Sequence, residues 1–579
     1  MKKILFFLYI LILTFLACCK DDEPNEGIIA YPAEKDKEFD QGSKVDFPEL
    51  HDQIIDDLEL LGRIWGFLKY HHPEVGKGKY NWDYELFRIL PQYLKARNNE
   101  ERDKIILNWI NKYGKIPVCT TCKLTPGAFI KPDLSWVENS NMNNSLKEKI
   151  KETYTNRYQG DHYYIRMSTS VPEFVHEKMY SSMPYPDAGF RLLALYRYWN
   201  IIHYFFPDKY LAEKDWNDVL REYIPLFLSV ANRLEYELAI MELIGEIDDS
   251  HAFLSGNSAI DELRGNNYAP FRVWFIEGKL AVTDYYNPQL KETSGLEIGD
   301  IITHINGETV ESIVENIKKY YPAANDARKL HNISFDLLRS KNSSININYI
   351  SSEQTGQKEI RLFDRSIIRI YNWFKDSNKC YKFLDDDIGY VTIATITIDD
   401  IPQIKESLKN AKGIIIDIRN YPPTFPSGHI GAELGSWFIY GSSTYAKCSI
   451  VNIDNPGEFT FTPIHYIQNS GETYRGKVIV LVNEITLSSA EFFAMVFRSG
   501  VNSTIIGSRT AGSLGAVSSI SLPGGLGTGF TGIGFYYPDG TPTQRVGIVP
   551  DVWIEPTIEG IRQGRDELLE KAISLINEE

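Results

Sequence analysis

A serine stands where a buried strand is expected to turn into a helix, and it is the first residue in this chain to suggest chemistry. The run 478–482 is wholly apolar, as in a buried strand, and 490–497 has the composition of a helix that Gly500 would end. Ser488 lies at this corner, followed by Ser489. Backbone N–H groups at a helix start carry partial positive charge and can stabilise an oxyanion. Ser488 is therefore a candidate nucleophile, although serine is also a favoured helix N-cap.

Histidine is a suitable general base for a serine nucleophile, because its unperturbed pKa is close to neutral. His251 directly follows Asp248, Asp249 and Ser250, at the end of an expected helix over 238–247. A lone histidine beside apolar residues is usually structural. The segment by itself leaves both interpretations open.

The two segments resemble serine peptidases related to C-terminal-processing proteases and to the tricorn core protease. In that family the nucleophile lies in a strand–Asn–x–x–(Thr/Ser)–x–Ser–(Ala/Ser)–(Ala/Ser)–Glu segment, which matches Ser488 as nucleophile, three residues before Glu491. A (Glu/Asp)-x-Ser-His segment resembles the tricorn-type site. The resemblance therefore implies that His251 is the general base and that Ser250 positions the imidazole or a water. It extends through much of the second half of the chain.

The same resemblance separates two branches of the family. In the C-terminal-processing branch, the segment after the strand near 505 carries a catalytic lysine, and Ser513 holds that position here. A histidine base is then required, in agreement with His251 and the tricorn-like branch. His429 is a rival base that we rank below His251. The nearby acids Glu491 and Asp551 are expected to be structural.

Two further parts of the implied site depart from the family pattern. The first oxyanion donor would be the N–H of Ser489. The second normally comes from a Gly-Gly pair, but Pro422 and Pro423 stand here and have no N–H, which leaves Thr424 as the nearest donor. Gln544 occupies a position where some members carry a glutamate. An amide can orient the base by hydrogen bonding but cannot stabilise an imidazolium by charge.

The N-terminus resembles a bacterial lipoprotein signal. Two lysines precede an apolar run over 4–17 that is too short to span a bilayer. We expect lipidation at Cys19, with Cys18 as the alternative, and a mature protein held in the cell envelope as an outer-membrane lipoprotein, periplasmic or surface-exposed. An uncleaved anchor would also tether the chain to the membrane.

Composition sets broad limits on function. The chain has 579 residues, of which 43% are apolar and 13% aromatic, enough for several domains with large cores. The formal charge of −16 argues against a nucleic-acid partner. Cys119 and Cys122 favour a local disulfide or free thiols over half of a zinc site. The expected chemistry needs neither a metal nor an organic cofactor.

The first half of the chain contains an internal repeat. Eight residues recur at a constant separation of 134 positions, in a pattern that reads as helix, proline turn and helix. The matching pairs are Leu61 and Leu195, Trp65 and Trp199, Tyr70 and Tyr204, Pro73 and Pro207, Trp82 and Trp216, Leu86 and Leu220, Pro91 and Pro225, and Leu94 and Leu228. The shared tryptophans are expected to pack in the two cores.

Short strands replace helices between about 257 and 352. Here Gly295 to Asp300 and the turn at Asn306-Gly307 resemble the most recognisable segment of PDZ domains. Such domains take an extended peptide and hold its C-terminal carboxylate, while a spacer or lid is an equal alternative. We therefore divide the chain into a signal peptide over 1–19, a linker over 20–46, helical copies over 47–165 and 166–255, a PDZ-like domain over 256–355 and a peptidase core over 356–579.

The predicted fold class is α+β and multidomain, with a duplicated helical module, a PDZ-like β domain and an α/β core of the ClpP/crotonase-like type. The predicted function is an exported, lipid-anchored serine endopeptidase that acts on peptides or proteins, with the substrate's C-terminus at the PDZ-like domain. The alternative is a weakly active or inactive peptide-binding or ligand-binding lipoprotein on the same fold. A structural surface lipoprotein ranks third.

Overall fold

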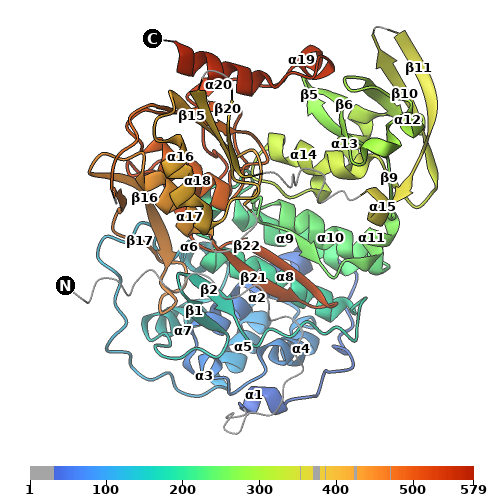
Figure 1. Cartoon of the computed structure of the whole chain (residues 1–579). Coiled ribbons are helices and arrows are strands. Elements are labelled where there is room, and N and C mark those ends of the chain that lie inside the picture. Colours follow the sequence, from blue (N-terminus) through green and yellow to red (C-terminus); the bar gives the residue numbers. More distant parts are fainter. Residues whose placement is uncertain are drawn as a thin grey trace.

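The computed structural model describes residues 31–352, 354–368, 379–384, 387–422, 427–469 and 471–578. They form a helical region, a middle β region and a C-terminal α/β core, so the chain is a mixed α and β protein of several domains (Figure 1). None of the helices in these ranges is long and apolar enough to cross a bilayer. The predicted signal peptide, with Cys18 and Cys19, lies outside the described residues.

The helical region fills the lower part of Figure 1. Apart from α2, its longer helices begin after Asn or Asp side chains that accept a hydrogen bond from an N–H of the first turn, as at α5 and α8. The helices are α1 (Pro32–Lys35), α2 (Asp52–His71), α3 (Pro73–Gly76), α4 (Trp82–Tyr93), α5 (Asn99–Asn111), α6 (Ser135–Asn139), α7 (Asn144–Thr155), α8 (Ala188–Phe205), α9 (Trp216–Ser229) and α10 (Arg233–Gly245). A hairpin of β1 (Ile165–Ser168) and β2 (Val171–Phe174) accompanies them.

Residues 31–46, predicted as part of a linker, pack against this region. The side chain of Arg88 in α4 binds Asp36 at 2.8 Å and Glu38 at 2.6 Å, and the N–H of Ser43 donates to Asp187 at 2.7 Å. Cys119 and Cys122 form a disulfide in the long connection between α5 and α6.

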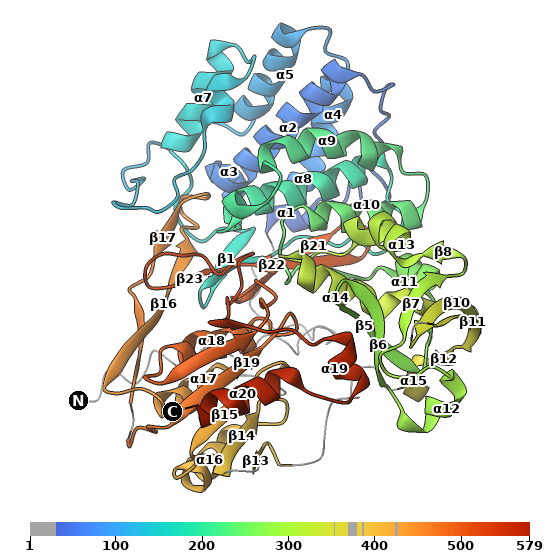
Figure 2. The ribbon, with the colours of Figure 1, turned by 90° about the horizontal axis from the view of Figure 1, so that it is seen from above.

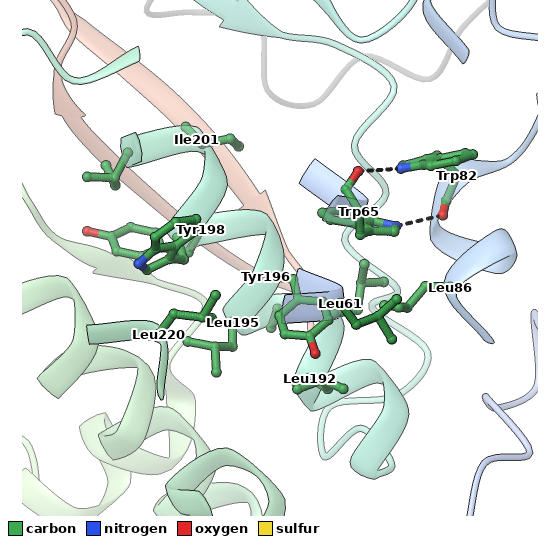
Figure 3. Packing of buried hydrophobic residues seen from close by; sticks show 14 of the residues in the cluster. Leu61, Trp65, Trp82, Leu86, Leu192, Leu195, Tyr196, Tyr198, Ile201 and Leu220 are labelled. Atoms are coloured by element: carbon green, nitrogen blue, oxygen red, sulfur yellow. Dashed lines mark hydrogen bonds between the residues drawn. The ribbon is translucent and has the colours of Figure 1, made fainter. Parts of the chain in front are cut away.

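Helices α2 and α8 cross at small residues of α2. A Cβ on Gly62 would lie 2.6 Å from the ring of Tyr196, so only glycine permits this approach. In α2 and α4, the indole N–H of Trp65 donates to Trp82 O at 3.0 Å, and that of Trp82 donates to Trp65 O at 2.8 Å (Figure 3). These bonds satisfy two buried indoles inside the apolar core.

Four charged side chains form a buried network between α2, α4 and α8. Lys69 lies 2.6 Å from Glu177, and Arg197 lies 2.8 Å from Glu177 and 2.7 Å from Asp83. Burial lowers the pKa of Lys69, while Glu177 and Asp83 oppose that shift. Removing one partner leaves an uncompensated buried charge, which is far more costly than breaking a surface pair.

We expect Glu177→Gln to lower the free energy of unfolding of the helical region by about 3–5 kcal/mol, because Lys69 and Arg197 lose their shared carboxylate. Glu173→Gln is the matched control. It breaks a more exposed pair with Arg166 and should cost less than about 1 kcal/mol. Urea unfolding followed by tryptophan fluorescence measures both losses. Equal losses in the two variants would contradict the prediction.

The middle β region contains an antiparallel sheet in the order β11-β10-β7-β6-β5, with helices α13 (Val310–Ile317) and α14 (Asp326–Leu337) beside it. Asn306 and Gly307 both have positive φ, at 51° and 89°, and join β7 to β8. The predicted hairpin turn is therefore confirmed. The strands are β5 (Phe271–Ile276), β6 (Lys279–Tyr285), β7 (Ile301–Ile305), β8 (Glu308–Thr309), β10 (Ser344–Ser351) and β11 (Gln354–Arg361).

The core is built on a sheet in the order β13-β14-β15-β19-β20-β24, parallel except for β13. Alternate side chains of its apolar strands are buried on opposite faces. Ile414 and Val480 pack against α16 (Ile401–Leu408), α17 (Ser427–Ser436) and α18 (Ser489–Arg498), whereas Ile415 and Leu481 face α20 (Glu567–Asn577). The strands are β13 (Tyr381–Phe383), β14 (Ile388–Thr392), β15 (Gly413–Asp417), β19 (Lys477–Val482), β20 (Ser503–Gly507) and β24 (Val552–Trp553).

A small sheet joins the core to the end of the helical region. Strand β22 (Leu526–Thr531) pairs with β21 (Val517–Leu522) on one side and with β3 (Leu254–Ser255) on the other. Because β3 begins three residues after His251, this pairing brings the last residue of β22, Thr531, to the histidine.

Candidate active site

Ser488 occupies the predicted corner between β19 and α18. Its φ of 56° and ψ of −113° lie where non-glycine residues are strained, a feature that recurs at functional sites. Its N–H donates to Glu491 Oε2 at 3.0 Å, and α18 begins at the next residue, Ser489. The serine is thus held at a helix start, with the N–H of Ser489 directly after it.

Glu491 ties this corner to the loop that follows β20. Its carboxylate is fully buried and accepts hydrogen bonds from Gly512 N at 2.8 Å, from Ser513 N at 3.2 Å and from the hydroxyl of Thr510 at 2.5 Å. Burial raises the pKa of Glu491, and these hydrogen bonds partly oppose the shift. The structural role expected for Glu491 agrees with these contacts.

The imidazole of His251 is oriented by Thr531 and Asp249. His251 Nδ1 lies 2.8 Å from Thr531 Oγ1, which lies 2.9 Å from Asp249 Oδ1. Asp249 Oδ2 accepts the backbone N–H of Thr531 at 2.6 Å. An ionised carboxylate only accepts hydrogen bonds, so the threonine hydroxyl donates to Asp249 and accepts from His251 Nδ1–H. This relay leaves the lone pair of the neutral ring on Nε2, as a general base requires.

Burial lowers the pKa of His251, with a further lowering by Arg328 and an opposing contribution from Asp249. The neutral, basic form of the ring is therefore retained to a lower pH than for a free histidine.

We expect the acid limb of a Ser488 acylation rate to have its midpoint below pH 6.5, the ordinary value for histidine. The rate should rise with pH through that midpoint, because only neutral His251 accepts a proton. The pH dependence of labelling by a fluorophosphonate measures it. His251→Ala should remove the limb, and a midpoint above 6.5 would contradict the prediction.

The segments of the serine and the histidine meet on the loop at 511–513. Ser250 Oγ donates to Ala511 O at 2.7 Å, and Ser250 N donates to Ser513 Oγ at 2.7 Å. Ser513 N in turn donates to Glu491, which caps the nucleophile corner. Among the described residues, no hydrogen bond joins Ser488 directly to His251. In enzymes such contacts commonly tighten only when substrate binds.

The residues predicted to orient the base make other contacts. Ser250 binds the 511–513 loop, not the imidazole, and Gln544 Nε2 donates to Asp248 O at 3.2 Å. Thr531 contacts the imidazole instead, and Asp249 accepts from the Thr531 hydroxyl; the sequence predicts neither residue for this position. Asp249, two residues before the histidine, carried a local signal. Thr531 is 280 positions away from His251, and no local sequence pattern indicates that the two residues meet.

The remaining predictions have mixed outcomes. Ser489 stands where its N–H follows the nucleophile, as expected for an oxyanion donor. Thr424 lies outside the described residues. His429 is in α17, and none of the hydrogen bonds in the described part of the chain links it to Ser488 or Glu491.

Known proteins are similar to parts of this chain. Residues 441–554, which include Ser488, match the family described as Peptidase family S41. The tricorn proteases of Thermoplasma volcanium and Thermoplasma acidophilum are both 24% identical, over 399 and 407 residues. These matches cover 65% and 67% of this chain but 35% and 34% of the relatives, so the chain spans about a third of their length.

A solved structure supports the fold. Mature CPAF complexed with lactacystin superposes with a TM-score of 0.54 at 15% identity, covering 67% of this chain and 99% of that one. The corner that carries Ser488 therefore lies in the segment that matches the family described as Peptidase family S41.

Proposed function

We propose that the protein is a serine endopeptidase in which Ser488 is the nucleophile and His251 the general base. The observation that carries the proposal is the relay from Asp249 through Thr531 to His251 Nδ1, at 2.9 and 2.8 Å. It fixes the tautomer in which Nε2 can accept a proton. The family match over the Ser488 segment and the strained serine at a helix start support the same reading.

In the proposed reaction, Ser488 Oγ attacks the peptide carbonyl and its proton passes to His251 Nε2, which requires an approach to about 3 Å. The N–H of Ser489 stabilises the oxyanion of the tetrahedral intermediate. The imidazolium then protonates the leaving amine, and a water deprotonated by His251 hydrolyses the acyl-enzyme. Asp249 stabilises the imidazolium through Thr531.

A fluorophosphonate probe tests the proposal, because it reacts only with an activated serine. We expect one covalent adduct, mapped by mass spectrometry to Ser488, and slower labelling by at least about 100-fold in His251→Ala. Ser489→Ala is the matched control, since it keeps its backbone N–H and should still be labelled. An unlabelled but folded protein that binds peptides saturably would instead support the binding-protein alternative.

The proposal extends to the organisation of the chain. Two helical copies are supported by matching indole contacts, since Trp199 and Trp216 donate to each other's carbonyls as Trp65 and Trp82 do. They are also supported by reciprocal contacts between the copies, at Arg63 with Asn217 and at Arg197 with Asp83.

The hairpin at 306–307 and the packing of α14 on β5 support a PDZ-like middle region, which would receive the substrate's C-terminus.

We further propose export to the cell envelope, with membrane attachment through a lipid at Cys19. The disulfide between Cys119 and Cys122 supports an oxidising compartment. Metabolic labelling with a palmitate analogue, compared between the wild type and Cys19→Ala, tests the attachment. Persistent labelling of Cys19→Ala that disappears in Cys18→Ala would move the lipid to Cys18.

A further inference from the structure

The first turn of α14 lies between the two halves of the candidate active site. In both Figure 1 and Figure 2, α14 is found where the three regions of the chain meet. The N–H of Ala324 donates to Ser250 Oγ at 2.9 Å, next to His251. Asn325 caps the helix and donates from Nδ2 to Thr510 O at 2.9 Å, on the loop bound to Glu491. A segment of the middle β region thus contacts both catalytic segments.

Arg328, in the same turn, has a guanidinium with few partners. Nη1 makes one long hydrogen bond, 3.4 Å, to the carbonyl of Glu484, four residues before Ser488. Nε is buried and has no partner among the described residues, and no carboxylate there forms an ion pair with this side chain. Burial lowers the pKa of Arg328 to about 10, and Glu484 and Glu491 oppose the shift.

The surroundings of Arg328 add further positive charge. Arg272 of β5 lies over the ring of Trp274 at 4.3 Å. Burial lowers the pKa of His331, and the charges of Arg328 and Arg272 lower it further. Glu484 and Glu491 are the acids that act on Arg328, and burial raises the pKa of both. The guanidinium of Arg328 is partly buried, with Nε fully buried, and it has no paired carboxylate among the described residues. A bound anion would reduce the cost of holding its charge there.

We propose that Arg328 is a specificity-determining residue that binds a carboxylate of the peptide substrate beside the scissile bond, an inference that rests on the proposed function. A guanidinium presents two parallel N–H groups that match the two oxygens of a carboxylate. The hydrogen bond to the carbonyl of Glu484 holds the guanidinium of Arg328 near the segment that carries Ser488. The carboxylate is either the C-terminus of the peptide or an acidic side chain.

The experiment measures binding, so that it does not depend on catalysis. Fluorescence anisotropy gives Kd for labelled peptides and full-length Ser488→Ala protein. One peptide has a free C-terminal carboxylate, a second is its C-terminal amide, and two further amides carry Asp or Asn at one internal position. We expect one acid form to bind about 10-fold to 100-fold more tightly than its neutral partner. The favoured pair identifies the source of the carboxylate.

Adding Arg328→Gln should abolish this preference, and Arg328→Lys should restore part of it as a point charge. Lys329→Gln is the matched control. Its side chain lines a separate charged cavity of about 500 Å³ with Asp248 and Glu242, so the preference should persist. The inference would be overturned if Ser488→Ala protein bound the acid and neutral peptides with equal affinity. It would also be overturned if Arg328→Gln weakened the binding of both peptide forms by the same factor. Fluorophosphonate labelling of wild-type protein reports separately on the proposed function.

Discussion

Ser488→Ala is expected to lower kcat for peptide hydrolysis by about 10⁴-fold to 10⁶-fold, because losing the nucleophile removes the entire covalent route. Cleavage of a fluorogenic peptide at saturating concentration measures the loss. The Ser489→Ala variant should stay within a few-fold of wild type, since only its backbone N–H takes part. Residual activity above about a tenth of wild type in Ser488→Ala would contradict the assignment.

The strained backbone provides an internal check on this result. Ser488 has a φ of 56°, a conformation that alanine tolerates no better than serine. Ser488→Ala should therefore lose activity without gaining stability. Ser488→Gly should also lose activity, but it should relieve backbone strain of about 1–3 kcal/mol. The greater backbone freedom of glycine in the unfolded chain offsets part of that gain. Thermal unfolding of the two variants compares these effects. A marked destabilisation of Ser488→Ala would indicate that its lost activity reflects misfolding.

Asp249→Asn is expected to lower kcat/KM by about 10²-fold to 10⁴-fold near neutral pH. The carboxylate accepts from Thr531 Oγ1 and His251 N at Oδ1 and from Thr531 N at Oδ2. An amide has a single acceptor oxygen, so in either orientation its NH₂ group faces a donor N–H, and the relay is disturbed. Where NH₂ faces Thr531 Oγ1, the hydroxyl must donate to His251 Nδ1. The ring then carries its proton on Nε2 and cannot accept one from Ser488, which is the effect of the corresponding substitution in serine-protease triads.

Asp248→Asn is the matched control for this variant. Asp248 accepts the N–H of Glu213 at 2.8 Å and faces Arg545 at 3.4 Å, and it makes no contact with Thr531 among the described residues. Nitrogen-15 NMR of the imidazole distinguishes the two tautomers directly. If Asp249→Asn kept the Nδ1–H tautomer and full activity, the relay would have no role.

Local patterns predicted much of the structure around the site. The corner at Ser488 follows from an apolar run, a cap and a second apolar run, all within about 25 residues. The turn at Asn306-Gly307 follows from two residues that tolerate positive φ. The tryptophans of the repeat pack as buried side chains, in agreement with their spacing.

The contacts that orient the base could not be predicted in this way. Thr531 reaches His251 because β22 pairs with β3, and that pairing depends on the docking of the core on the helical region. Gln544 was placed by its distance from a family motif, yet its side chain meets the backbone of Asp248. Arg328 acts from a third region, whose docking on the core no short-range pattern encodes. The spacing of residues within one segment can indicate a nucleophile or a base. The relay to His251 joins segments that are distant in the chain, so no such spacing predicts it.

The pairing of β3 with β22 has a consequence for biogenesis. Thr531 follows about nine-tenths of the polypeptide, so a growing chain that has not reached β22 lacks the contact that orients His251. If the proposed function holds, reactivity of Ser488 is expected only once β22 has docked on β3, so an incomplete chain would not cleave peptides. A version ending before β22 should remain unreactive towards fluorophosphonate, and adding the missing C-terminal fragment in trans should restore labelling.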